Sequence, residues 1–577
     1  MNLQAIYHQP KSNYCYAYNE STIHIRIRVA AGDVSRVVLV YGDKFKWNCH
    51  GEVAMTYSCS TGLFDYFTIE IPFMSRLAYY FQVVGESEIY YYTQWGIVNE
   101  FDETQGHFYY FQYPYIHKSC VHQVPDWVRD SVFYEIFPDR FLKGNADNDP
   151  ENIEAWEARP SPGSFFGGDL DGIIEKIGYL KELGINAIYL TPIFTSASNH
   201  KYDTLDYFTI DSHFGNLATF KKMVSICHEN GIRVILDGVF NHCSCLSMQF
   251  QHAIEHGSAS PYFNWFYFNE SSVKTGSPDY EMFSTVSNMP KLKTENQEVR
   301  DHLLSIVHYW MEKTDIDGWR LDVADELDPQ FLREFRESVR QHKEDAYILG
   351  EAWHNASSWL MGDQLDAVMN YQFTMACLNF FAFNKINKVE FVQMINKVQM
   401  DHTRQVNDVG FNLLESHDTA RFLTQCDKDI RKLMLAATFQ LTYTGAPCIY
   451  YGTETGIEGG EDPDCRRTFI WDKSHWNMEV YQYIKKLIHI RRDYEALRRG
   501  SFHWINSKCD VIFYERKLLS QHIIVVINHH AKIMEVDINI GKSIFTDLLS
   551  NRKYDLRRSS KASIVVPGCS AKLLLAE

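Results

Sequence analysis

The stretch Arg233-Val-Ile-Leu-Asp-Gly-Val-Phe-Asn-His242 decides how this chain folds. Its first residues form a short apolar run, which predicts a buried strand, and Gly231 ends the helical segment that precedes it. The predicted strand ends at Asp237, and the polar residues Asn241 and His242 follow a few positions later. A helix followed by a buried strand is the repeating unit of a parallel sheet, so this stretch predicts an α/β domain.

The same alternation of helix and strand continues from about residue 130 to residue 498. We predict strands over residues 132–137, 187–191, 233–237, 316–321, 346–350, 367–370, 410–414 and 448–451. Eight such units over about 370 residues fit a closed (β/α)8 TIM barrel with insertions. Residues 242–298, which are rich in Ser, Gly and aromatic side chains, are expected to form a small subdomain inserted into the barrel.

Both ends of the chain have a different pattern. Ile23-His-Ile-Arg-Ile-Arg-Val29 alternates apolar and polar residues, and His522-Ile-Ile-Val-Val-Ile-Asn528 is a second strand-like run. Short strands separated by turn residues are typical of β-sandwiches. We therefore predict three domains: an N-terminal β-sandwich over residues 1–122, a catalytic barrel over 123–498 and a C-terminal β-sandwich over 499–577.

Composition narrows the class of protein. The 577 residues carry a formal net charge of −17, which argues against nucleic acid as a partner because phosphate binding needs a basic face. No apolar run reaches the roughly 18 residues that would span a membrane. The 13 cysteines form no compact framework, and the chain opens without a secretory pattern, so we expect reduced thiols and a cytoplasmic protein.

Acidic residues follow three of the predicted strands, at the end of the barrel where active sites lie. They are Asp322, Glu351 and Asp418, and Arg320, His242 and His417 are expected among them on the same rim of the barrel. Partly desolvated charges are costly unless they have a task. Cleavage of a glycosidic bond needs one carboxylate as nucleophile or base and one carboxylic acid as proton donor, which this set could supply.

The two key carboxyl groups are expected to differ in their surroundings. Arg320 stands two residues before Asp322 and therefore on the same side of the strand, where it should keep Asp322 ionised. Glu351 has fewer cations near it in the sequence, so we expect its pKa to rise and the residue to serve as the acid. Asp237 could have a structural role, in which it supports Arg320.

Four segments together resemble the α-amylase family of retaining α-glucan hydrolases. They are Asp237-Gly-Val-Phe-Asn-His242, Gly318-Trp-Arg-Leu-Asp-Val-Ala324, Gly350-Glu-Ala-Trp353 and Ser416-His-Asp-Thr419. Met289-Pro-Lys-Leu292 is similar to the segment that marks the neopullulanase, cyclomaltodextrinase and maltogenic amylase subgroup. Phe166-Gly-Gly-Asp-Leu170, 445–452 and 459–467 add further similarity, and the resemblance is strong from about residue 125 to 500.

The resemblance implies a role for each matching residue. Asp322 would be the nucleophile, Glu351 the general acid and then the base, and Asp418 would stabilise the distorted sugar. The expected substrate-binding residues are Arg320, His242, His417, Tyr202, Glu326 and Trp353. Retention of configuration would place the carboxyl groups of Asp322 and Glu351 about 5–5.5 Å apart. The implied substrates are cyclodextrins, maltooligosaccharides and pullulan, with some transglycosylation. The resemblance also implies a homodimer in which the N-terminal sandwich packs over the partner's active site.

Two departures from the subgroup pattern affect these expectations. Asp325 stands where the subgroup usually has Asn, which puts an extra negative charge near the acceptor side. The resemblance also implies one structural calcium ion, with Asn145, Asn148, Asp149, Gly167 and Asp169 as candidate ligands. Lys143 stands where the calcium-binding pattern of the relatives has its first Asn ligand, and an ammonium offers calcium no oxygen. Either calcium binds there, or the Lys143 ammonium takes its place and pairs with Asp149 and Asp169.

Other readings of the sequence remain open at this point. An α-glucosidase or a sucrose-active relative could share the barrel, although Met289-Pro-Lys-Leu292 argues against it. A carbohydrate-binding protein that has lost its chemistry is a second alternative, which the intact set of Asp322, Glu351 and Asp418 disfavours. Ser416-His-Asp418 could suggest a serine hydrolase, but no Gly-x-Ser-x-Gly motif precedes it.

Overall fold

The computed structural model describes residues 1–577 except 101, 103–105, 270–278, 539–543 and 558–562. The chain divides into two compact units. The first comprises Met1–Val124, Ser357–Asp366 and Val389–Asn407, and the second comprises Pro125–Ala356, Ala367–Lys388 and Asp408–Glu577.

An eight-stranded parallel barrel forms the centre of the second unit. Its sheet order is β18-β17-β16-β15-β12-β11-β20-β19, and every neighbouring pair is parallel. A parallel bridge between Met369 and Phe411 joins the two ends of this sheet and closes it. The strands are β11 (Phe133–Ile136), β12 (Ala187–Leu190), β15 (Arg233–Gly238), β16 (Gly318–Leu321), β17 (Tyr347–Gly350), β18 (Ala367–Val368), β19 (Phe411–Leu413) and β20 (Ala446–Tyr450). The predicted barrel and all eight predicted strands are confirmed.

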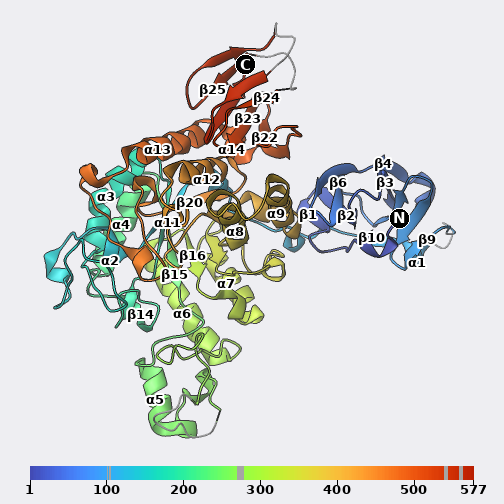
Figure 1. Cartoon of the computed structure of the whole chain (residues 1–577). Helices are drawn as coiled ribbons and strands as arrows, with labels where there is room; N and C mark the ends of the chain where they lie inside the picture. Colours follow the sequence, from blue (N-terminus) through green and yellow to red (C-terminus); the bar gives the residue numbers. More distant parts are fainter. Residues whose placement is uncertain (101, 103–105, 270–278, 539–543, 558–562) are drawn as a thin grey trace. The chain divides into compact units, whose positions relative to one another are not determined.

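Helices cover the outside of the barrel (Figure 1). The longer ones are α3 (Leu170–Leu183), α4 (Leu217–Glu229), α6 (Gln297–Thr314), α7 (Pro329–His342), α12 (Ile430–Thr442) and α13 (Met478–Asp493). Local sequence sets their ends. Asp169 caps the N-terminus of α3 by accepting from the backbone N–H of Gly172, and Gly184 ends the helix with φ +102°. Shorter helices of this unit are α2 (Pro138–Phe141), α8 (Tyr371–Cys377), α11 (Phe422–Gln425) and α14 (Glu495–Arg499). Helix α10 (Arg404–Asp408) begins in the first unit.

An excursion between β15 and α6 carries the expected inserted subdomain, which projects from the barrel (Figure 1). It contains α5 (Met248–His256) and short one-turn helices. Isolated bridges, His242 to Lys291 and Phe266 to Leu292, hold its two ends together. Because the excursion starts at the carboxyl end of β15, its residues lie beside the ends of the barrel strands. It therefore contributes to the wall of the site described below.

The first unit contains an antiparallel sandwich of two sheets. One sheet has the order β1-β2-β6-β5 and the other β4-β3-β7-β8-β9, with β10 paired to β7. Its strands are β1 (Cys15–Asn19), β2 (Thr22–Ala30), β3 (Arg36–Asp43), β4 (Gly51–Ala54), β5 (Thr56–Ser60), β6 (Phe64–Pro72), β7 (Leu77–Val84), β8 (Ile89–Thr93), β9 (Gly96–Val98) and β10 (Phe111–Tyr113), with α1 (Gly106–Tyr109) before β10. Alternate residues such as Ile23, Ile25 and Ile27 are buried in one apolar core between the sheets, as the period-two pattern predicts.

Two stretches from the middle of the sequence pack with this sandwich. By sequence, residues 357–366 and 389–407 fall within the predicted catalytic domain over residues 123–498, and in the structure they belong to the same compact unit as the sandwich. Helix α9 (Lys388–Asp401) provides the reason, because its carboxyl end accepts a hydrogen bond from Arg26 at the Met400 carbonyl (2.5 Å). Asn396 also donates to the carbonyl of Ser60 (2.8 Å). Such long-range contacts leave no periodic pattern in the sequence.

The C-terminal region forms the expected second β-sandwich within the second unit. A six-stranded sheet has the order β21-β22-β23-β28-β25-β26, and β24 pairs with β27. The strands are β21 (Ser501–Trp504), β22 (Ile512–Leu518), β23 (Gln521–Asn528), β24 (Met534–Asp537), β25 (Ile544–Asp547), β26 (Lys553–Asp555), β27 (Ser563–Val566) and β28 (Ser570–Ala576). Apolar side chains from both sheets share one core. A further antiparallel pair, β13 (Phe194–Ser196) and β14 (Thr204–Ile210), lies in the loop after β12.

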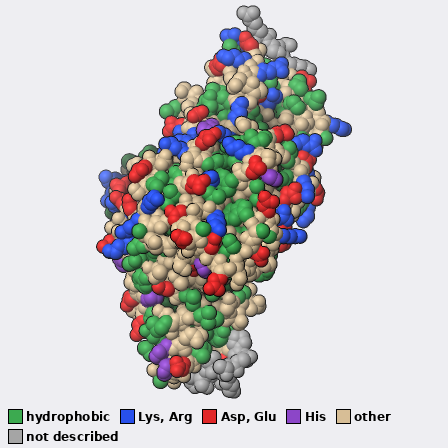
Figure 2. Space-filling view, turned by 90° about the vertical axis from the view of Figure 1, so that its left-hand side faces the viewer, with side chains coloured by type: hydrophobic (Ala, Val, Ile, Leu, Met, Phe, Trp, Pro, Cys, Tyr) green, Lys and Arg blue, Asp and Glu red, His purple; other side chains and the backbone are tan. Residues whose placement is uncertain are grey.

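Surface side chains of opposite charge are intermixed on the face shown in Figure 2. Such mixing is typical of a solvated protein surface. Within the described parts of the chain, every helix is too short or too polar to cross a membrane.

Candidate active site

A cavity of about 570 Å³ opens at the carboxyl end of the barrel strands. It is lined by His200, Tyr202, His242, Phe283, Val286, Met289, Asp322, Val323, Asp325, Glu326, Glu351, Trp353, Asp418, Asp462 and Arg466. The volume suits a small organic ligand, and the lining combines apolar walls with a few convergent polar groups. The structure therefore brings together Asp322, Glu351 and Asp418, which the sequence placed after three different strands.

Arg320 occupies the centre of the floor beneath this cavity. The strand β16 carries it and then ends one residue before Asp322, so both side chains point to the same side. Its Nη1 donates to Oδ1 of Asp322 at 2.8 Å and to Oδ2 of Asp237 at 3.0 Å. Its Nη2 lies 2.9 Å from Oε2 of Glu351. One fully buried guanidinium therefore faces three carboxylates, and the structural role expected for Asp237 is met by a direct contact with Arg320.

This sharing changes two expectations from the sequence. Glu351 has fewer cations near it in the sequence, but in the structure a guanidinium nitrogen of Arg320 reaches its carboxylate. Arg320 favours the ionised form of Asp322, as predicted, but it is only one of several groups that set the pKa of this carboxyl group. Burial raises the pKa of Asp322, Arg320 lowers it, and the neighbouring carboxylates of Glu351 and Asp237 raise it again, so the pKa lies above its usual range.

The two oxygens of Asp322 have different surroundings. Oδ1 accepts from Arg320, whereas Oδ2 faces the ring of His242, whose Nε2 lies 3.8 Å away. Neither ring nitrogen of His242 makes a hydrogen bond of normal geometry with the described residues, and burial lowers the pKa of His242 to about 3. A neutral imidazole with unused polar atoms thus lines the cavity beside the free oxygen of Asp322.

Glu351 is held on the opposite side of the same guanidinium. Its Oε2 accepts from the backbone N–H of Val323 at 3.1 Å, and its Oε1 accepts from the indole N–H of Trp353 at 2.9 Å. Val323 has a positive φ of 45°, which a β-branched residue adopts only under strain. This strained turn directly after Asp322 aims a backbone N–H at Glu351, and strain of this kind is concentrated at functional sites.

Aromatic side chains complete the walls. Trp353 is 51% exposed and stacks flat on Tyr371, with ring centroids 3.7 Å apart and an interplanar angle of 6°. On the side of the inserted subdomain, Phe283 stacks on His242 at 4.9 Å. Exposed aromatic faces of this kind suit contact with the apolar faces of sugar rings.

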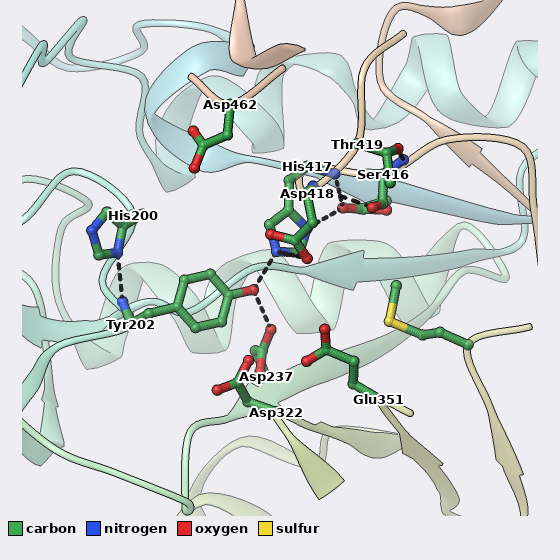
Figure 3. Close-up of polar contacts among 12 residues, drawn as sticks. His200, Tyr202, Asp237, Asp322, Glu351, Ser416, His417, Asp418, Thr419 and Asp462 are labelled. Carbon is green, nitrogen blue, oxygen red and sulfur yellow. Dashed lines mark hydrogen bonds and ion pairs between the residues drawn. The ribbon is translucent and has the colours of Figure 1, made fainter. Parts of the chain in front are cut away.

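Tyr202 and Asp418 lie on a third side of the cavity, where Figure 3 shows the Tyr202 hydroxyl between Asp237 and His417. Tyr202 Oη is 2.9 Å from Oδ2 of Asp237 and 2.6 Å from Nε2 of His417. Asp418 contacts the same Nε2 at 3.1 Å through Oδ2 and Nη2 of Arg466 at 3.4 Å through Oδ1. Burial alone would raise the pKa of Asp418, but His417 and Arg466 lower it below its usual range.

His417 differs from the expected picture of a sugar ligand. Its side chain is buried behind Tyr202 and Asp418 and does not line the cavity in the described structure. Glu326 lies at the rim, where its carboxylate pairs with Lys291 at 2.7 Å. Asp325, which replaces the usual Asn, pairs with His354 at 2.8 Å.

Sequence reasoning missed several residues of the site. Phe283 and Val286 come from a loop that has no periodic pattern, so no signal marked them, whereas Asp462 lies in the segment 459–467 that already showed similarity to the family. Glu135 was also missed, but the sequence did contain a signal for it. A charged residue inside the apolar run Val132-Phe-Tyr-Glu-Ile-Phe137 is unusual for a buried strand.

The expected cation site forms a separate cluster near the start of α3. The Lys143 ammonium donates to Oδ2 of Asp149, and Oδ1 of Asp149 is buried without a hydrogen-bond partner among the described residues. Gly167 is essential beside it, because a Cβ there would lie 2.7 Å from that oxygen. Asp169 instead accepts from the backbone N–H groups of Gly144, Asn145 and Gly172 at 3.1, 2.8 and 2.7 Å.

This donor set fits an ammonium better than a calcium ion. Calcium takes six to eight oxygen ligands. Here Asp149 already binds a cationic side chain, and Asn145 uses its side-chain oxygen to accept from the backbone of Asp147. Asn148 donates its amide to Asp169 at 3.4 Å and so turns a donor, not an acceptor, toward the cluster.

Comparison with known proteins identifies the family. Residues 135–477 match the family described as alpha amylase, catalytic domain, and residues 1–117 match the alpha amylase N-terminal ig-like domain. The chain belongs to the α-amylase family, and it is a glycoside hydrolase of that family.

The relatives narrow the comparison to one subgroup. The chain is 45% identical over 568 residues to a cyclomaltodextrinase of Geobacillus thermopakistaniensis, covering 96% of both chains. It is 41% identical over 559 residues to the intracellular maltogenic amylase of Bacillus subtilis strain 168, covering 94% of this chain and 95% of the relative. A solved structure named cyclomaltodextrinase is 40% identical, covers both chains fully and superposes with a TM-score of 0.95. The predicted resemblance is confirmed.

Proposed function

We propose that this chain hydrolyses α-1,4 bonds of cyclodextrins, maltooligosaccharides and pullulan with retention of configuration, and that it transfers part of the product to sugar acceptors. The observation that carries the proposal is the arrangement of Asp322 and Glu351 on either side of one buried guanidinium at the floor of the cavity. Two carboxyl groups flanking one scissile bond are what a retaining glycosidase needs. The names of the relatives, cyclomaltodextrinase and maltogenic amylase, support the choice of substrates.

The contacts suggest how the reaction proceeds. Oδ2 of Asp322, the oxygen that Arg320 leaves free, attacks the anomeric carbon and forms a covalent glycosyl-enzyme. Glu351 gives its proton to the leaving glycosidic oxygen. It then removes a proton from water, or from the hydroxyl of an acceptor sugar, which attacks the same carbon and releases Asp322. Asp418 binds ring hydroxyls and stabilises the positive charge that develops on the sugar.

Binding residues surround this reaction on three sides. Tyr202 lies beneath the sugar at the cleavage point, and His242 offers an unused ring nitrogen beside Asp322. Trp353 and Glu326 contact the sugar on the acceptor side, where Trp353 presents an exposed indole face. Asp325 and its partner His354 lie on the same side and tune the preference for acceptors.

A product profile tests the proposal directly. β-Cyclodextrin, pullulan, starch and isomaltose are each incubated with the enzyme, and the products and their initial anomeric form are measured by chromatography and proton NMR. We expect maltose or short units from β-cyclodextrin, with the α-anomer formed first. Release from isomaltose but not from β-cyclodextrin would support an α-glucosidase instead, and binding without any release would support a non-catalytic carbohydrate-binding protein.

We also propose that the Lys143 ammonium replaces the structural calcium ion at Asp149. The direct contact between the two side chains supports this choice, because it gives the half-buried carboxylate a cation without a metal.

We further propose that the protein is cytoplasmic and forms a homodimer. A relative named as intracellular and the free state of all 13 cysteines support the location. The match of residues 1–117 to the family's N-terminal domain supports the dimer that the resemblance implies. Analytical ultracentrifugation at micromolar concentration tests the assembly, and a monomeric mass would contradict it.

A further inference from the structure

Glu135 is a fully buried carboxylate in strand β11, and no step of the proposed reaction uses it. Its Oε1 lies 2.6 Å from Nδ1 of His417 and accepts the backbone N–H of the same residue at 3.2 Å. Its other oxygen, Oε2, has no hydrogen-bond partner among the described residues. A buried carboxylate with one oxygen unpartnered is costly unless a cation lies beside it.

The contact fixes the position of one proton. A carboxylate only accepts hydrogen bonds, so the hydrogen between Glu135 and His417 belongs to Nδ1. Whether Nε2 also carries a hydrogen depends on its two neighbours. They are Oη of Tyr202 at 2.6 Å and Oδ2 of Asp418 at 3.1 Å.

Only a protonated Nε2 satisfies every group in this chain of contacts. The single hydrogen of the Tyr202 hydroxyl can point to Asp237, at 2.9 Å, if the phenol oxygen accepts from Nε2. A bare Nε2 would instead take that hydrogen, so Asp237 would lose a donor and the Asp418 carboxylate would face a lone pair. Burial opposes protonation of His417, but the carboxylates of Asp418 and Glu135 outweigh it and raise its pKa.

We propose that Glu135 is a positioning residue of the active site, which holds His417 as an imidazolium and thereby orients Tyr202 and Asp418. Glu135 touches neither the cavity nor the reacting atoms. It acts through His417, which lies between it and the cavity wall. The inference rests on the proposed glycosidase function, because it assigns Tyr202 and Asp418 to the sugar at the cleavage point.

The pH dependence of this device is set by the groups around the imidazole. The titratable and charged groups that face the His417 ring from the surrounding elements are Glu135, Asp418, Tyr202, Asp237, His200 and Arg466. Arg466 donates its Nε to the His417 carbonyl at 2.7 Å, and its positive charge opposes that of the ring. If Glu135 loses its charge, Asp418 is the one carboxylate that still contacts His417, and it must offset the positive charge of Arg466. The imidazolium would therefore persist only at lower pH.

The test compares Glu135→Gln and Glu135→Asp with the wild type on β-cyclodextrin between pH 4 and pH 9, roughly the range in which His and carboxylate groups titrate. Gln keeps the size and can still accept from Nδ1, but it has no charge. We expect kcat to fall by about tenfold to a hundredfold, KM to change less, and the pH optimum to move down by about one unit. Glu135→Asp keeps the charge, so we expect its pH optimum to equal that of the wild type and its kcat to lie between those of Glu135→Gln and the wild type.

Glu454→Gln serves as the matched control. Glu454 is also fully buried, and its Oε1 accepts from Tyr134, the neighbour of Glu135, at 2.7 Å, but it does not contact His417 in the described structure. A purely structural role for Glu135 would lower activity at all pH values alike, as in this control, and would overturn the proposal. If Glu135→Gln does not fold, a changed optimum in Glu135→Asp overturns it equally.

Failure of the proposed function gives a different result. A wild type that releases nothing from β-cyclodextrin, pullulan or maltooligosaccharides contradicts the glycosidase. An active wild type with an unshifted Glu135→Gln profile contradicts only the role of Glu135.

Discussion

Arg320 and Asp322 are separated by one residue in the sequence and joined by a hydrogen bond of 2.8 Å in the structure. The same guanidinium also contacts Asp237, which lies in the neighbouring strand β15, and Glu351, which directly follows the neighbouring strand β17. This shared cation determines the electrostatics of the whole site, because three buried carboxylates depend on it.

Removal of Glu351 should abolish turnover and keep sugar binding. We expect Glu351→Gln to lower kcat by about a hundredfold to ten-thousandfold, because the amide cannot donate a proton to the leaving oxygen. Binding of a maltooligosaccharide, measured by calorimetry, should stay within a few-fold of the wild type. Glu326→Gln is the matched control at the rim of the same cavity, and unchanged turnover in Glu351→Gln would refute the assignment of the acid.

Loss of the shared cation should destabilise the fold as well as stop the reaction. In Arg320→Met, Asp237, Asp322 and Glu351 would be left without their central cation, and breaking a buried ion pair costs about 3–5 kcal/mol. Urea unfolding with an activity assay would measure both effects. Arg467→Met is the control, since Arg467 pairs with Asp464 at a more exposed position. A stability equal to that of the wild type would show that water, not Arg320, satisfies these carboxylates.

The loss of kcat/KM at acid pH should follow the protonation of Asp322. The pKa of its carboxyl group is raised by burial and by Glu351 and Asp237, so the ionised nucleophile is lost as the pH falls through this raised value. Asp237→Asn removes one of the opposing charges and frees Arg320 for Asp322. We therefore expect the acid limb of kcat/KM to move to lower pH in this variant. A limb that stays in place, or moves upward, would contradict this coupling.

Chelation should leave the wild type unchanged. Because Lys143 already gives Asp149 a cation, EDTA or added calcium should shift the melting temperature by less than about one degree. Lys143→Asn removes the ammonium and restores the residue type of the calcium-binding pattern, so calcium should then raise the melting temperature measurably. A wild type that loses stability or activity in EDTA would show that calcium, not Lys143, occupies the site.

Residues that follow a strand directly could be placed from the sequence. The end of a barrel strand fixes both the edge and the side to which the next residues point, so Asp322 and Glu351 could be assigned to one rim without coordinates. Glu135 could not be interpreted in this way. Its position inside a strand predicts burial, but its partner His417 lies 282 positions away and follows another strand.

The sequence by itself determined the barrel, the two sandwiches and the three carboxylates that the structure gathers at one cavity, because local periodicity and strand ends are properties of short stretches. Only the tertiary structure decided how charge is distributed among them. It brought Arg320 to Glu351, buried His417 behind Tyr202 and placed residues 389–407 with the N-terminal sandwich. The strength of a charge depends on distance and burial in three dimensions, and neither quantity follows from the spacing of residues along the chain.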